Sequence, residues 1–151
     1  MIFLEKSEEV EIEISMEPVE EAVAAALVHQ EAPKDADLTV VLTDDVQLHA
    51  LNLEWMGVDG PTDVLSFPSD EIDPEGGNRY LGDILVSLQR AEEQAQAAGH
   101  STLAEVQLLV VHGVLHLMGH DHAEPEDKAR MWKAQAEILT ELGLGNIQIR
   151  D

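Results

Sequence analysis

Residues 102–122 read TLAEVQLLVVHGVLHLMGHDH, and this stretch decides the fold. From 103 to 118 its clearly polar residues are only Glu105, Gln107, His112 and His116. A helix that is apolar almost all the way round is a buried helix. The stretch therefore predicts a buried central helix, around which the rest of the chain builds one core.

The histidines of this stretch have the spacing of metal ligands. His112 and His116 are four residues apart, so a helix carries both imidazoles on one face. Gly119 follows three residues later, and glycine readily takes the positive φ that ends a helix. The chain can then turn back and present His122. Because several buried imidazoles without a partner would be costly, we predict that His112, His116 and His122 bind one metal ion.

The pattern H-x-x-x-H-x-x-G-x-x-H is that of the metzincin zinc site, with Gly113 where that site has a catalytic glutamate. Three protein ligands leave one coordination position open, which is typical of a catalytic zinc. Zinc is favoured for three imidazoles, although nickel or copper would bind the same set. We expect His120 to point away from the ion. Asp121 is the candidate for proton transfer, although it could also orient a ligand imidazole or begin the next helix.

The composition is typical of a soluble globular protein. A chain of 151 residues, 44% of them hydrophobic, predicts a single domain over residues 1–151. The absence of cysteine excludes disulfides and thiolate metal sites. No apolar run reaches transmembrane length, and the first residues lack the pattern of a signal peptide. We therefore expect a cytoplasmic protein without a membrane partner.

The charge is strongly negative and uneven. The net charge is −23, with 20 acidic and 2 basic side chains in residues 1–75, against 11 and 6 in residues 76–151. A nucleic-acid partner usually requires a basic patch, and none is visible in the sequence. The histidines lie in the less acidic half, where a bound metal ion would add positive charge. The acidic excess indicates a solvated surface, and adaptation to high salt is a second hypothesis.

The remaining segments predict an α+β fold with a mixed sheet of about four to five strands flanked by helices. Strand patterns fall at 2–4, 10–14, 37–42, 63–68 and 80–87. Helix patterns fall at 17–31, 44–56, 88–99, 102–118 and 125–142. Thr102 and Glu105 fit a capping box at the start of the central helix. The Pro/Gly/acid-rich segment 69–78 is expected to connect a surface hairpin.

Three motifs together resemble the YbeY family of single-strand-specific metalloendoribonucleases, which act in ribosomal RNA maturation. Residues 112–122 match the family signature H-G-x-L-H-L-x-G-[HY]-D-H throughout. The signature P-T-D-V-L-S-F-P stands at 61–68, and L-G-D-I stands at 81–84. Their order and spacing agree with the family, and the resemblance covers nearly the whole chain.

The resemblance implies a zincin-like fold and three metal ligands, which are His112, His116 and His122 in this chain. It also implies a substrate of single-stranded RNA rather than DNA, namely ribosomal RNA in ribosomal particles, with roles in rRNA 3′ end maturation and ribosome quality control. Family members often have a Tyr-Arg pair before the second signature, and its arginine would contact phosphate. The pair here is Trp55-Met56, so another cation must replace that contact, with Arg79 and Arg90 as candidates, or binding is weaker.

Several alternatives stay open at the level of the sequence. Asp63 and Asp83 stand one in each shorter signature. One of them orients a metal-bound histidine or water, or both only cap turns or satisfy buried amides. The nucleophile is water or the neighbouring ribose hydroxyl. Trp55 is the aromatic residue best suited to stack on an unpaired base. Two other functions compete with the nuclease: a zinc peptidase of metzincin type, which Gly113 opposes, and a non-catalytic metal-stabilised module that binds ribosomes. The oligomeric state is not encoded in any pattern.

Overall fold

The structure is a computed structural model that describes residues 1–72 and 79–147. Within those ranges the elements in chain order are β1 (Ile2–Lys6), α1 (Met16–His29), β2 (Asp37–Thr43), α2 (Asp45–Met56), β3 (Val64–Ile72), β4 (Arg79–Ser87), α3 (Leu88–Ala98), α4 (Thr102–Leu117) and α5 (Pro125–Glu141). None of the helices in this part of the chain combines the length and apolar character needed to cross a bilayer.

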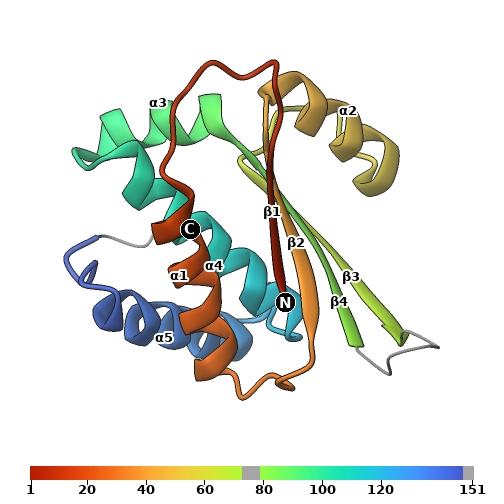
Figure 1. The fold of residues 1–151 in the computed structure, drawn as a ribbon, viewed down its shortest axis with the longest axis vertical. Helices are drawn as coiled ribbons and strands as arrows, with labels where there is room; N and C mark the ends of the chain where they lie inside the picture. The colour runs from red at the N-terminus through yellow and green to blue at the C-terminus, as the bar shows by residue number, and fades with distance from the viewer. Residues whose placement is uncertain (73–78, 148–151) are drawn as a thin grey trace.

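The four strands form one mixed sheet in the order β1-β2-β4-β3. β1 and β4 both run parallel to β2, while β3 pairs with β4 in the antiparallel sense. Helices α1, α4 and α5 lie on one side of the sheet and α2 lies on the other (Figure 1). The predicted α+β class with a mixed, helix-flanked sheet is confirmed, and the described part contains four strands.

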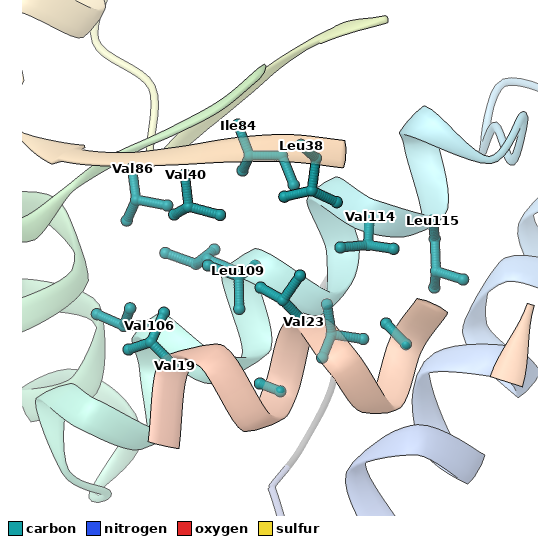
Figure 2. Close-up of a cluster of buried hydrophobic side chains, with 14 of the residues drawn as sticks. Val19, Val23, Leu38, Val40, Ile84, Val86, Val106, Leu109, Val114 and Leu115 are labelled. Carbon is teal, nitrogen blue, oxygen red and sulfur yellow. The ribbon is translucent and has the colours of Figure 1, made fainter. Parts of the chain in front are cut away.

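The core lies between the sheet and α4. Leu38 and Ile84 from neighbouring strands face Leu109 and Val114 of α4, and Val23 of α1 closes the cluster (Figure 2). Each of these side chains is 5% exposed or less. Burial of such a side chain contributes about 1.5–3 kcal/mol, so α4 holds the sheet and the outer helices together. The predicted buried central helix is confirmed.

One predicted strand is wrong. Residues 10–14 form no strand, and they cross irregularly from the end of β1 to the start of α1. Their burial does alternate, since Val10 is buried and Glu11 and Glu13 are exposed. An extended segment lying over a core gives the same alternation as a strand. The period-two pattern therefore indicates that one face of the segment is buried. It does not show that the segment pairs with a neighbouring strand.

The start of α4 and the end of β3 also differ from the predictions. Ser101, not Thr102, caps α4, because its hydroxyl accepts a hydrogen bond from the Ala104 amide at 3.0 Å. Glu105 is fully buried and accepts from His100 Nε2 at 2.6 Å, so it does not complete a capping box. β3 continues to residue 72, where a loop was expected from residue 69, and residues 73–78 lie outside the described part.

Gly113 allows α4 to pack directly on the sheet. A β-carbon at this position would lie 2.7 Å from Cγ2 of Ile84, a fully buried side chain of β4. We therefore expect Gly113→Ala to lower the free energy of unfolding by about 1–3 kcal/mol, as overpacking does. Urea denaturation measures this change. Alanine should instead stabilise an unobstructed helix by about 1 kcal/mol, so a gain in stability would contradict the close packing.

Candidate functional site

The three predicted ligand histidines meet at the end of α4. His112 and His116 lie on its last turns, and Gly119, with φ +96°, turns the chain after the helix so that His122 returns to them. Each residue offers one ring nitrogen, and these three atoms lie within 4.8 Å of one another. The Nε2 atoms of His112 and His116 are 3.0 Å apart. The side chains that the sequence predicted to converge do so.

Gln135 of α5 orients His112. Its Oε1 lies 3.1 Å from Nδ1 of His112, and Gln135 is only 1% exposed. Because an amide oxygen only accepts hydrogen bonds, the proton of the neutral ring stands on Nδ1, and the lone pair of Nε2 faces the other two histidines. A metal-binding histidine is usually held in this way.

The sequence analysis missed Gln135. The sequence did contain a signal for this residue. Met131, Gln135 and Ile138 are spaced at the helical repeat, so they lie on one face of α5, and all three are buried. An amide on the apolar stripe of a helix needs a polar partner. Its partner lies 23 residues away in the chain, so the helical pattern indicates that Gln135 has a polar partner but does not identify His112 as that partner.

The site favours neutral imidazoles, which is the form that binds a metal ion. Burial, and then the charge of the neighbouring His116, lowers the pKa of His112 to about 4. Burial is also the main cause that lowers the pKa of His116, followed by the charge of His122. The Trp132 ring packs edge-on against two of the histidines and covers one side of the cluster. Its ring centroid lies 6.2 Å from that of His112 and 5.8 Å from that of His122.

The histidines open into a hollow of about 380 Å³. Its opposite wall is formed by Met56 at the end of α2, by Thr62 and Asp63, and by residues 64–66 and 68 of β3. In the described part of the chain, no fourth His, Cys, Asp or Glu joins the three-histidine group. The group can therefore hold a metal ion with one side left for a substrate.

Residues 112–122 at the end of α4 and residues 61–68 on the opposite side of the hollow are the two longest signatures noted in the sequence. A family model described as "Endoribonuclease YbeY" matches residues 2–143, which include both segments and the whole sheet. The chain belongs to the endoribonuclease YbeY family.

Similar proteins extend over most of the chain. A protein of Clavibacter michiganensis subsp. michiganensis is 43% identical over 141 residues, covering 90% of this chain and 92% of its own length. One from Chloroflexus aurantiacus is 46% identical over 134 residues, covering 85% and 87%. Both carry the name endoribonuclease YbeY.

A solved structure shares the fold. The solution structure of TM1509 from Thermotoga maritima matches with a TM-score of 0.58 and 25% identity. The match covers 100% of this chain and 97% of that one.

Two other residues of the family signature, His120 and Asp121, do not line the histidine hollow. Nε2 of His120 lies 2.8 Å from Oε1 of Gln30, the residue that caps the end of α1, as expected for a histidine outside the cluster. Asp121 accepts a hydrogen bond from the backbone N–H of His122 at 2.7 Å, and with His120 it lines a separate hollow. Asp121 therefore holds the backbone of His122, and its role in proton transfer stays a prediction.

The two aspartates of the shorter signatures are separated by the structure. Asp63 lines the histidine hollow, and its negative charge offsets a small part of the lowering of the His112 pKa that burial causes. Asp83 lies in a neighbouring hollow on the other face of the sheet. Of the two, Asp63 is therefore the one placed to act beside the histidines.

The position of the family arginine is occupied by Met56, which lines the histidine hollow. Neither arginine suggested as its replacement lines that hollow. The guanidinium of Arg90 donates to Asp45 at 2.9 Å, and Arg79 lies at the start of β4. The structure thus gives no support to a substitution by either of these two arginines.

Proposed function

We propose that this chain is a zinc-dependent endoribonuclease that cuts single-stranded RNA. The three ring nitrogens, gathered in an open hollow, are the observation that carries the proposal. Residues 1–151 would act as one catalytic domain with a zincin-like arrangement, in which the central helix carries two ligands and the following turn carries the third.

The residues present fit a zinc ion. His112, His116 and His122 would hold it, since three neutral imidazoles suit zinc and also nickel or copper. A zinc ion supplies Lewis acidity, which polarises a phosphoryl oxygen and makes water acidic enough to lose a proton near neutral pH.

The protein groups around the ion would set the geometry and handle the proton. Gln135 holds the His112 ring so that the Nε2 lone pair of His112 is directed into the cluster. Asp63 in the hollow and Asp121 beside His122 are the candidate proton acceptors, and Asp63 is the one that lines the hollow. Met56 carries no charge, so phosphate binding at this wall would be weaker than an arginine would provide.

Single-stranded RNA is the substrate that fits this site and the family. A single strand can bend its backbone into a concave site, whereas a stiff duplex cannot. The family resemblance favours ribosomal RNA in ribosomal particles, with action in rRNA 3′ end maturation and ribosome quality control in the cytoplasm. The acidic chain offers no general attraction for either polyanion, so the preference for RNA over DNA rests on the family resemblance and not on charge.

The packing of Gly113 weighs against a zinc peptidase. The metzincin mechanism needs a glutamate base directly after the first histidine. In this chain position 113 lies against Ile84, where even a β-carbon would be too close. A larger side chain there would have to displace α4 from the sheet.

The test of the proposed function is cleavage of matched RNA substrates by metal-loaded protein. We expect cutting of an unpaired oligoribonucleotide, loss of cutting on addition of a chelator, and recovery on return of zinc. The same sequence in a duplex, its DNA counterpart and a peptide library should remain intact. Bound metal with no RNA cleavage would contradict the nuclease and would support the non-catalytic ribosome-binding module.

A further inference from the structure

A second hollow adjoins the histidine site. It measures about 580 Å³ and lies between the end of α2 and the face of β3 and β4 that points away from α4. It shares Met56, Ser66 and Pro68 with the histidine hollow, so the two hollows adjoin at the end of α2 and at β3, an edge strand of the sheet. A polymer whose backbone enters the histidine hollow would therefore place an adjacent unit in the second one.

The walls of the second hollow suit a flat ring. Its lining is mainly apolar and includes Leu51, Trp55, Phe67 and Leu85. The Trp55 ring packs edge-on against Phe67, with 6.3 Å between the ring centroids, yet Trp55 remains 64% exposed. An exposed indole over an apolar floor is a platform on which an unpaired nucleobase can stack.

One polar group in the hollow is fixed in place. The Tyr80 hydroxyl donates to Oδ1 of Asp83 and lies 2.6 Å from the hydroxyl of Thr39. These contacts hold the carboxylate on the sheet, while Asp83 still lines the hollow. A carboxylate accepts hydrogen bonds and repels phosphate, so a base and not a phosphate belongs here.

We propose that this hollow, lined by Trp55, Phe67 and Asp83, binds one unpaired guanine of the RNA substrate. Guanine presents two adjacent donors, N1–H and the N2 amine, which match a carboxylate. The donors of adenine, cytosine and uracil stand beside acceptors that a carboxylate repels. This inference rests on the proposed function, because the histidine hollow is where the neighbouring phosphodiester would lie.

The test uses metal-loaded protein and single-stranded oligoribonucleotides that differ at one position, which holds guanine, inosine, adenine or uracil. We expect guanine to give a kcat/KM about tenfold or more above adenine, in the range of one bidentate base contact, with inosine between them because it lacks the N2 amine. Asp83→Asn should remove this preference. Trp55→Ala should weaken binding of every strand about tenfold, as loss of one stacked base does.

A control and a second measurement separate this proposal from the proposed function. Leu53→Ala changes another exposed side chain of α2, 50% exposed and outside both hollows, and should behave as wild type. Fluorescence anisotropy in the presence of a chelator measures strand binding without cutting. Equal binding of all four strands, unchanged in Asp83→Asn, would overturn the guanine site even if cleavage occurs. Guanine-selective binding without cleavage would support the site and contradict the nuclease.

Discussion

Replacing His116 with alanine is expected to remove the bound metal ion and to lower cleavage of single-stranded RNA by more than about 100-fold. Loss of a residue that only orients a ligand typically costs 10- to 100-fold, and loss of the ligand itself should cost more. His116 lies at the end of α4, is only partly buried and lines the histidine hollow. The variant should therefore still unfold cooperatively. Elemental analysis and the RNA assay measure the two losses.

His120→Ala is the matched control for this variant. It removes an imidazole from the same motif, but one whose Nε2 faces Gln30 just after the end of α1. We expect metal content and cleavage close to those of wild type. Activity retained in His116→Ala would reveal a contaminating ribonuclease or a catalytic centre elsewhere in the chain. Equal loss in both variants would show that the motif acts through folding.

Gln135→Leu is expected to lower zinc affinity about 10- to 100-fold, although Gln135 would not touch the ion. Leucine keeps an apolar volume on α5 but removes the acceptor of the His112 Nδ1–H bond. The ring is then free to rotate or to change tautomer, so its Nε2 lone pair is no longer held toward His116. Competition with a chelator of known affinity measures the change, and nitrogen NMR of the histidine rings reports the tautomer directly.

Gln135→Glu distinguishes positioning from packing. A carboxylate at this place still accepts from Nδ1–H, so zinc affinity should stay within a few-fold of wild type. The tautomer of His112 should also be kept. Equal loss of affinity in the leucine and glutamate variants would show that the glutamine matters for packing alone. Unchanged affinity in both would remove Gln135 from the site.

The sequence predicted the centre of this molecule well because the relevant signals are local. The apolar character of α4 and the four-residue spacing of His112 and His116 follow from helix geometry alone. The positive φ of Gly119 then needed only a glycine at the right place. These local rules brought the three imidazoles together before any tertiary contact was considered.

The errors and omissions concern contacts between distant segments. Residues 10–14 alternate in burial as a strand does, but the edge of the sheet beside β2 is already taken by β1. Gln135 on α5 contacts His112 on α4, and no spacing rule within one helix predicts this contact. Glu105 fits the pattern of a capping box, yet it is turned inward to His100. Each case depends on a partner that the local pattern does not specify.

The most direct test is X-ray absorption spectroscopy on protein loaded with one equivalent of zinc, together with a crystal structure that locates the ion by anomalous scattering. We predict one ion held by His112, His116 and His122, with zinc–nitrogen distances of about 2.0–2.1 Å and at least one ligand from solvent. An ion bound elsewhere, or a fourth protein group completing the coordination sphere, would contradict the proposed open catalytic site.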